Sequence, residues 1–222
     1  MKARFRAKIS TKLVISLMSV VAISGFSSVF LGLNVINNNV VGQAYEEVRS
    51  HLNTALYVYN ERMKIIYLFL NHLSSLEYLQ TAILTNNRPI LVEKLIKVKN
   101  ELNIDIMTIT DARGRVIARA NKPESFGDDE SGDAFVKYVL ENRKPCSGTD
   151  IVTREQLLRE SKQLADRAYI RVIPTLRARP KDRIYETKGM CKKAAAPIFS
   201  GDRLIGVIYG AKLLNNNFDM VN

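Results

Sequence analysis

The side chains that most often carry out chemistry in proteins are scarce in this sequence. Its two histidines, His51 and His72, fall in one predicted long helix and cannot chelate a metal together, so each is interpreted as a helix-surface or packing residue. No nucleotide-cradling glycine motif, nucleophile elbow, His-Glu metal motif, phospho-accepting histidine box or ATP-binding catalytic region occurs. The sequence therefore predicts a protein that is not an enzyme, with no cofactor and no metal site.

Two clusters of charged residues remain. The acidic run Asp128, Asp129 and Glu130 lies in a polar stretch that lacks the ligand spacing of an EF-hand, and we interpret it as a solvated loop. The basic cluster lies in the proline-containing stretch 174–189. Its members are Arg177, Arg179, Lys181 and Arg183.

The composition is that of an ordinary globular chain, with 46% hydrophobic and 25% charged residues. The formal net charge is +11, and five basic residues near the N-terminus leave +6 for the rest. That excess is compatible with an anionic small molecule, nucleic acid or a solvated surface. Nucleic acid is not expected, because no aromatic-interleaved basic motif is present. With two cysteines, the chain is not a disulfide-dense scaffold and lacks zinc-ligand spacing.

Residues 13–33 form an uncharged apolar run, long enough for a helix to cross a hydrocarbon core of roughly 30 Å. Residues 1–12 carry basic side chains and no acid, and such a flank stays in the cytoplasm. A cleaved signal peptide is the alternative, but its apolar core is shorter, about 7–15 residues. We expect a single N-terminal span in the inner membrane, with the bulk of the chain periplasmic or extracellular.

A long helix is predicted from about residue 41 to residue 85, because the stretch contains no proline and its apolar residues recur at steps of three and four. This spacing is close to a heptad seam. Two interpretations stay open, and both can hold: the apolar stripe packs on its own domain, or it pairs with the same helix of a second subunit in a homodimer. The stripe comprises Tyr45, Val48, Leu52, Leu56, Tyr59, Met63, Ile66, Leu70 and Leu73.

The rest of the chain alternates short helices with strands. A helix at 89–102 precedes a β-hairpin at 104–120, whose turn has Asp111 and Gly114. Further predicted elements are a helix at 133–141, a strand at 147–152, a helix from a capping box at 153–156 to about 165, a strand-like run at 168–173, and a terminal hairpin around 200–202. Antiparallel strands with segregated helices predict an α+β domain.

These elements together resemble the extracytoplasmic Cache domains, PAS-like sensor modules of bacterial sensor histidine kinases and methyl-accepting chemoreceptors. The resemblance covers most of the chain after residue 33 and implies a linker of two helices at 34–102 followed by a PAS-like antiparallel sheet with flanking helices at 103–222. It is carried by the hairpin ITDARGRVIARA, by the segments at 168–170, 174–175, 177–180, 186–190 and 193–198, and by the G-x-x-Y-G-x-x-L-L-N strand at 206–215.

The resemblance implies a ligand-sensing input module of a two-component kinase or chemoreceptor, which relays ligand binding through the long helix. In such proteins the chain continues into a second span and an output domain, so its C-terminal end is expected to be incomplete here. The alternative is a singly anchored periplasmic binding or interaction protein with no signalling output.

Pockets in PAS-like sheets lie between the sheet and its covering loops, and the resemblance places loop 169–188 in that role. A small organic ligand, such as a carboxylate, is the expected partner, because arginine binds carboxylates through two parallel hydrogen bonds. A solvated basic loop is the alternative. The candidate ligand-binding residues are Tyr169, Arg171, Arg177, Arg183 and Tyr185.

The resemblance also makes the strands that carry Cys146 and Cys191 neighbours in the sheet. Both cysteines lie beyond the predicted span, in a compartment that favours oxidised thiols. A disulfide between them is therefore a candidate, and two buried cysteines that never pair are the alternative.

Overall fold

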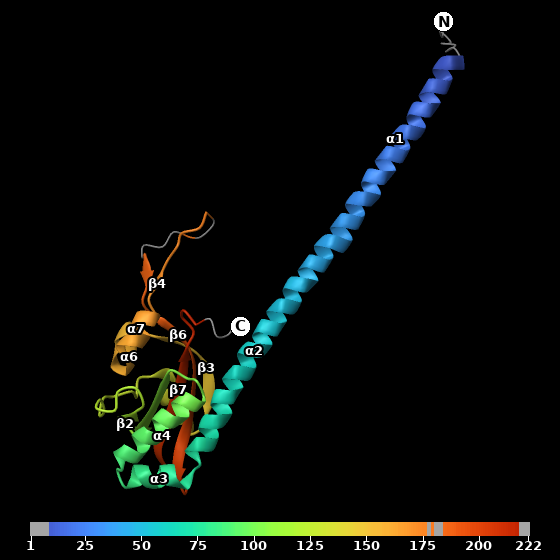
Figure 1. Ribbon diagram of the computed structural model, residues 1–222. Helices are drawn as coiled ribbons and strands as arrows, with labels where there is room; N and C mark the ends of the chain where they lie inside the picture. The colour runs from blue at the N-terminus through green and yellow to red at the C-terminus, as the bar shows by residue number, and fades with distance from the viewer. Residues whose placement is uncertain (1–8, 177–178, 180–183, 218–222) are drawn as a thin grey trace. The chain divides into compact units, whose positions relative to one another are not determined.

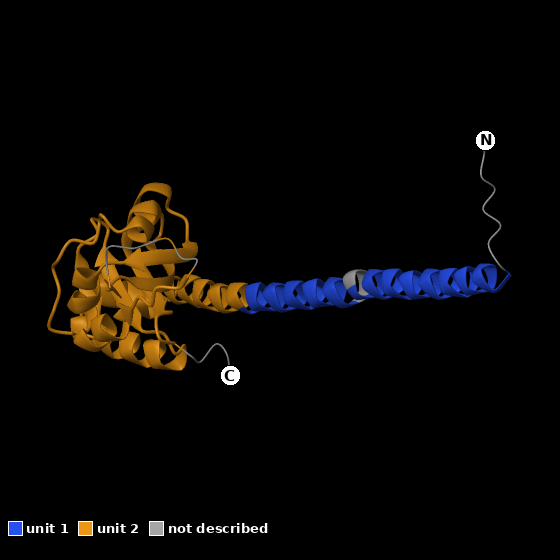
Figure 2. Ribbon diagram, turned by 90° about the horizontal axis from the view of Figure 1, so that it is seen from above, with its two compact units in different colours: residues 1–58 blue, residues 59–222 orange. Residues whose placement is uncertain are grey.

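A computed structural model describes residues 9–176, 179 and 184–217 of the chain. It contains two compact units, residues 1–58 and 59–222, and the boundary between them falls within helix α2 (Gly42–Ser74) (Figure 2).

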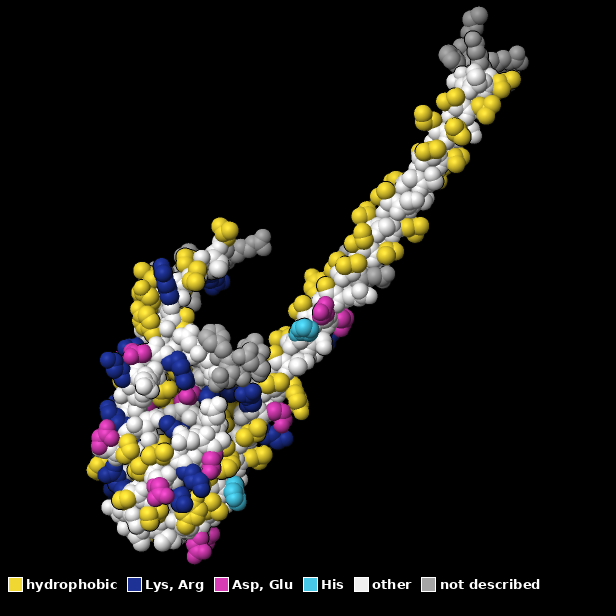
Figure 3. Space-filling view, viewed as in Figure 1, with side chains coloured by type: hydrophobic (Ala, Val, Ile, Leu, Met, Phe, Trp, Pro, Cys, Tyr) yellow, Lys and Arg dark blue, Asp and Glu magenta, His cyan; other side chains and the backbone are white. Residues whose placement is uncertain are grey.

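The described part of the first unit is entirely helical. It contains α1 (Ile9–Val35), the π-helical segment η1 (Ile36–Val41) and the beginning of α2. No residue of α1 is buried, and apolar side chains are exposed along its whole visible length (Figure 3). Among the described residues, α1 is the one helix that is long and apolar enough to cross a membrane, and it contains the predicted span 13–33.

The second unit is built on a five-stranded antiparallel sheet with the order β2-β1-β7-β6-β3 (Figure 1). A separate two-stranded ribbon pairs β4 with β5. The strands are β1 (Ile106–Asp111), β2 (Val116–Arg119), β3 (Cys146–Val152), β4 (Ile170–Arg171), β5 (Tyr185–Glu186), β6 (Gly189–Ser200) and β7 (Arg203–Leu213). The mixture of helices with an antiparallel sheet confirms the predicted α+β fold class.

Both predicted hairpins are present, and turn chemistry closes each of them. In the β1–β2 turn, Asp111 Oδ1 accepts hydrogen bonds from the backbone N–H groups of Arg113 and Arg115, at 2.8 and 2.9 Å. Gly114 has a φ of +83°, and a Cβ atom there would lie 2.8 Å from Ser131, so this turn requires glycine. Gly201, in the β6–β7 turn, has a φ of +59°.

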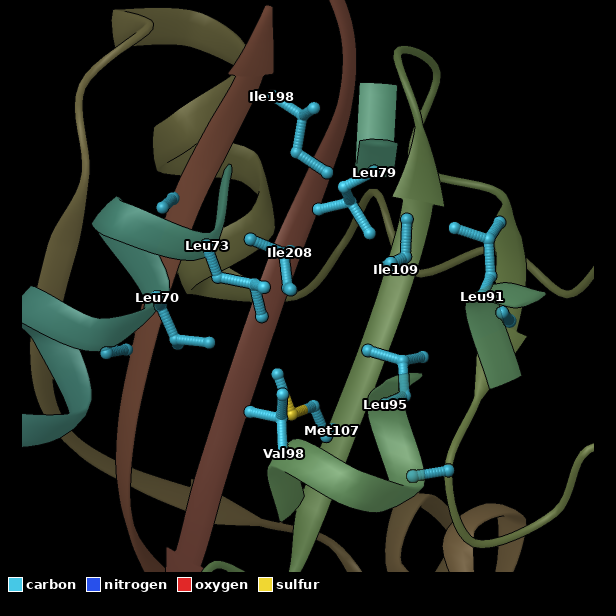
Figure 4. Packing of buried hydrophobic residues seen from close by; sticks show 14 of the residues in the cluster. Leu70, Leu73, Leu79, Leu91, Leu95, Val98, Met107, Ile109, Ile198 and Ile208 are labelled. Carbon is cyan, nitrogen blue, oxygen red and sulfur yellow. The ribbon is translucent and has the colours of Figure 1, made fainter. Parts of the chain in front are cut away.

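Both faces of the sheet are covered by helices, because consecutive residues of β1, β6 and β7, which point to opposite faces, are buried. The end of α2, α3 (Glu77–Leu84) and α4 (Arg88–Glu101) pack on one face, where leucines and isoleucines of helices and strands meet (Figure 4). The other face packs against α5 (Ala134–Asn142), α6 (Arg154–Glu160) and α7 (Lys162–Arg167). On β7, Ile208 faces the first set of helices, while Val207 and Tyr209 face the second.

The predicted long helix is shorter than expected. It ends at Ser74, where the Ser75 hydroxyl donates to the His72 carbonyl at 2.7 Å, and Leu76 adopts an extended conformation before α3 begins. This break lets α3 pack Leu79 into the core. The predicted helix from 153 to 165 is likewise divided at Ser161, an extended residue that caps α7.

The apolar stripe of α2 has two different environments. Its C-terminal members, among them Met63, Ile66 and Leu70, are buried in the second unit, so the prediction that the stripe packs on its own domain is confirmed there. The N-terminal members of the stripe are more than half exposed: Tyr45, Val48, Leu52 and Leu56.

Candidate functional site

A charged side chain is completely buried at the end of β2. Arg119 has no exposed surface, although it stands in the apolar strand sequence VIAR. Leaving a charge in a protein interior without partners is very costly, so a buried guanidinium needs carboxylates around it. Three carboxylates meet this requirement: Asp128 through a pair of hydrogen bonds of 2.6 Å each, Glu160 at 2.8 Å and Glu130 at 3.1 Å.

These carboxylates come from two different segments. Asp128 and Glu130 belong to the loop after β2, and Glu160 is the last residue of α6. Thr108 of β1 also donates to Glu160, at 3.2 Å. The prediction that Asp128, Asp129 and Glu130 form a solvated loop is wrong for two of the three, because the buried guanidinium draws Asp128 and Glu130 inward. Only Asp129 is exposed.

A second guanidinium, that of the half-exposed Arg159, lies 3.6 Å from Glu130 and 4.0 Å from Asp128, so two arginines face three carboxylates. The pKa values of the group reflect this excess of carboxylates. Burial alone would lower the Arg119 pKa, but the hydrogen bond to Asp128 and the charge of Glu160 raise it. The hydrogen bond to Arg119 lowers the pKa of Asp128. Burial raises the pKa of Glu130 and of Glu160, despite the nearby arginine. The two glutamates are therefore the members of the cluster that take up protons most readily.

A second ion cluster lies close by and is centred on Lys193 of β6. Its ammonium group contacts Asp133, which also caps α5 by accepting from the Phe135 and Val136 N–H groups, and lies 3.3 Å from Asp150 of β3. Side chains of both clusters line a cavity of about 20 Å³ between the sheet and α5–α6. A cavity of that size holds about one water molecule. Its polar lining consists of Glu130, Asp133, Gln156, Glu160, Lys193 and Tyr209.

The cavity wall is predominantly acidic, with three carboxyl groups and one ammonium group. Burial raises the pKa of Tyr209 well above its ordinary value, and the charges of Glu160 and Glu130 raise it further, so this hydroxyl stays neutral. The arrangement is suited to holding a compact positively charged group. It offers no nucleophile with a depressed pKa. Among the described residues, no cluster of three or more His, Cys, Asp or Glu side chains could hold a metal ion.

The residues predicted to bind ligand lie elsewhere. The rings of Tyr169 and Tyr185 stack with their centroids 4.8 Å apart, and Arg171 pairs with Tyr185 between β4 and β5. All three side chains are substantially exposed, and none of them lines the cavity. Arg177 and Arg183 lie outside the described residues. The role of this loop as a carboxylate site thus remains a prediction.

The two cysteines are on neighbouring strands, as predicted, but both are free. Cys146 is opposite Ala195, whereas Cys191 is opposite Asp150. This offset of four residues along the ladder corresponds to about 13 Å, far beyond the reach of a disulfide. Both thiols are partly or fully buried, which raises the pKa of Cys146 to about 11 and that of Cys191 to about 12. The structure therefore agrees with the alternative prediction, that the two cysteines do not pair.

Comparisons with known proteins give a consistent result. A family model described as "Double sensory domain of two-component sensor kinase" matches residues 43–221. The sensor domain of the Vibrio cholerae histidine kinase DctB has 14% sequence identity to the chain, with a TM-score of 0.52, covering 81% of this chain and 58% of that one. A domain of a putative sensory box/GGDEF family protein from Vibrio parahaemolyticus has 16% identity and a TM-score of 0.51. The match covers 80% of this chain and 62% of that one.

The likeness to these solved structures, at such low identity, concerns the fold. The chain spans about three fifths of the length of the structures it matches. No curated protein matches it in sequence.

We expect Arg119→Met to lower the free energy of unfolding by about 3–5 kcal/mol at pH 7, because it leaves buried carboxylates without a counter-charge. The loss should shrink as the pH falls toward the ordinary glutamate pKa of 4.5, since Glu130 and Glu160, with raised pKa values, become neutral first. Denaturant unfolding of the detergent-solubilised chain, followed by circular dichroism at several pH values, measures both effects.

The matched control is Arg113→Met, which changes an exposed arginine in the β1–β2 turn and should cost little. An equal loss in the two variants, or a loss at Arg119 that is independent of pH, would contradict the charge-compensation account.

Proposed function

Because this chain belongs to the family of double sensory domains of two-component sensor kinases, we propose that it is the extracytoplasmic input module of a bacterial transmembrane receptor. In this proposal the module binds a small molecule, and α2 relays the binding toward the membrane. The observation that carries the proposal is the small, partly open and charged cavity between the sheet and α5–α6. A sensor needs a site where a ligand can alter packing, and this cavity is lined by residues of the sheet, of α6 and of the loop before α5.

The charge of the cavity indicates the class of ligand. Three carboxyl groups and one ammonium group form its wall, and Asp128 engages the nearby guanidinium with two hydrogen bonds. A ligand that brings a positive charge removes the repulsion among the carboxylates, whereas an anion adds to it. An ammonium group is compact and donates three hydrogen bonds, which suits both the acidic wall and the volume of about 20 Å³. The proposed ligand is therefore a small molecule that places a primary ammonium group in the cavity, which has room for little more, and keeps the rest of its atoms outside it.

A route from the cavity to α2 runs through two adjacent residues of β6. Lys193 belongs to the ion cluster at the cavity. Its neighbour Lys192 points to the opposite face, where its ammonium group donates to the Tyr59 carbonyl of α2 at 3.2 Å. The Tyr59 hydroxyl in turn hydrogen-bonds to Thr149 of β3. A ligand that binds one of two arrangements of β6 more tightly than the other would shift the strand and change how α2 is held. A ligand that binds both arrangements equally would transmit no signal.

Titration calorimetry of the detergent-solubilised chain against propylamine and propanoate tests the ligand class. We expect propylamine to bind, and Glu160→Gln to weaken that binding by about tenfold or more, because the variant replaces a charged acceptor with a neutral one. Affinity should rise with pH above 4.5, since bound amine competes with protons for Glu130 and Glu160.

Glu155→Gln is the matched control, because Glu155 is an exposed residue of the same helix. Amine binding that is unaffected by Glu160→Gln would overturn the assignment. Propanoate binding that is lost in Arg171→Ala would support the loop predicted from the sequence instead.

The family and the apolar α1 support the further proposal that the chain is anchored in the inner membrane with residues 34–222 outside the cytoplasm. We expect alkaline phosphatase fused after Asn222 to be active and a reporter that works only in the cytoplasm to be silent. The basic residues before α1 set this orientation. The reverse pattern would overturn it.

The exposed N-terminal part of the α2 stripe supports a homodimer formed through this helix. Under mild oxidation in membranes, Leu52→Cys should give a disulfide-linked dimer, because a residue on the seam meets its own copy in a parallel pair. Ser50→Cys is the matched control, since it lies about 200° around the helix from Leu52. Equal cross-linking at the two positions, or none at either, would rule out this seam.

A further inference from the structure

A second and larger pocket lies on the opposite face of the sheet from the acidic cavity. It has a volume of about 350 Å³, within the usual range for sites that bind small molecules. Its wall combines side chains of α2, of the turn between α4 and β1, and of the β6 and β7 strands. The lining residues that matter here are Arg62, Ile65, Leu102, Ile104, Lys192 and Lys212.

The charged residues among the described lining residues are all cationic, and two asparagines, Asn103 and Asn217, complete the polar part of the wall. Arg62, Lys192 and Lys212 line the pocket, and no aspartate or glutamate does. Within the described part of the chain, none of the three cations forms an ion pair: Lys212 donates to the Asn103 amide oxygen at 3.0 Å, and Lys192 donates to the Tyr59 carbonyl. Among the residues that the structure describes, no carboxylate compensates the charge of this wall.

Lys192 is the key residue, because it is 99% buried. Its ammonium group lies 3.8 Å from the centroid of the Tyr59 ring and uses one hydrogen on the Tyr59 carbonyl. An ammonium group has three hydrogens to donate, so two remain for an acceptor. Burial lowers the pKa of Lys192, and the charge of Arg62 lowers it further. No carboxylate of the described residues offsets these two effects.

The remaining wall is apolar. Ile65, Leu102 and Ile104 contribute aliphatic surface beside the three cations. Ile65 is 56% exposed, so it leaves apolar surface open at the wall of the pocket. A bound molecule with a short hydrocarbon chain would cover it.

We propose that this pocket binds a small organic anion, with its acidic group at Lys192, Lys212 and Arg62 and its hydrocarbon part against Ile65, Leu102 and Ile104. The site goes beyond the proposed sensing cavity, because it lies on the other face of the sheet, shares no lining residue with the cavity and selects the opposite charge. Lys192 donates to the Tyr59 carbonyl of α2, so an anion bound in this pocket would contact the ammonium group that connects β6 to α2.

The test is titration calorimetry of the full chain in a non-ionic detergent, with pentanoate as the probe. Pentylamine and pentanol have the same chain without the negative charge, and inorganic phosphate has the charge without the chain. We expect saturable binding of pentanoate and binding at least about tenfold weaker for the other three. Arg62→Gln and Lys212→Gln should each weaken pentanoate binding by about tenfold, because each removes a charged donor.

Both substitutions are at partly or fully exposed side chains, so the variants should fold even where Lys192→Met does not. The matched control is Lys64→Gln, because Lys64 is an exposed cation of α2 that does not line the pocket. No saturable pentanoate binding, equal affinity for phosphate, or binding that survives both Arg62→Gln and Lys212→Gln would overturn the proposal. Glu160→Gln should leave pentanoate binding unchanged, which separates this site from the amine site.

Discussion

The burial of Arg119 is the constraint on which much of the second unit depends. A guanidinium at the end of an apolar strand is tolerable only when carboxylates reach it, and here they come from the loop after β2 and from the end of α6. The same contacts therefore fix where that loop lies and how α6 meets the sheet. They also bring three carboxylates together with two arginines, Arg119 and the half-exposed Arg159, so acidic groups are in excess in this cluster.

The sheet separates two electrostatic environments. The face under α5–α7 contains the acidic cavity, while the face under α2–α4 is apolar in its interior and ends in a cationic pocket beside α2. The separation is possible because consecutive strand residues point to opposite faces. Lys192 and Lys193 have the same chemistry and adjacent positions, yet their surroundings differ. Lys193 is paired with carboxylates, whereas Lys192 lies against the Tyr59 ring and near other cations.

Local sequence signals predicted much of this fold. The two hairpins were predictable because Asp111, Gly114 and Gly201 act through turn geometry that depends on a few neighbouring residues. The end of α2 was not predictable, because Ser75 and Leu76 are compatible with a helix and only the packing of α3 on the core separates the two elements. The predicted pairing of the two cysteines was wrong for a related reason. The resemblance to the family indicated which strands are neighbours, but the alignment of β3 on β6 depends on contacts made throughout the sheet.

The charged cavity was overlooked although the sequence contained a signal for it. Arg119 interrupts the apolar strand VIAR, and Lys192–Lys193 interrupt the apolar stretch 190–199. A charge inside a strand that is otherwise suited to a core requires a buried partner, so the acidic run 128–130 should have been read as that partner. Sequence reasoning instead gave weight to the exposed arginines of the 169–188 loop, because they are clustered along the chain. Proximity along the chain says little about which charges meet in space.

The centre of β6 has the sequence KKAAA, so each face of the strand presents a lysine followed by alanine. A strand normally encodes its alignment through the difference between the residues on its two faces, and a one-residue slip is prevented because it would turn that pattern over. The middle of β6 encodes no such difference. Its alignment comes from particular positions: Lys193, which pairs with Asp133 and Asp150, and the two ends, where a bulge follows Ile198 and Gly189 lies against Leu157 and Leu213. The alanines between these positions would fit either face, so a few fixed contacts, and not the pattern along the strand, determine which residues of β6 meet its neighbours.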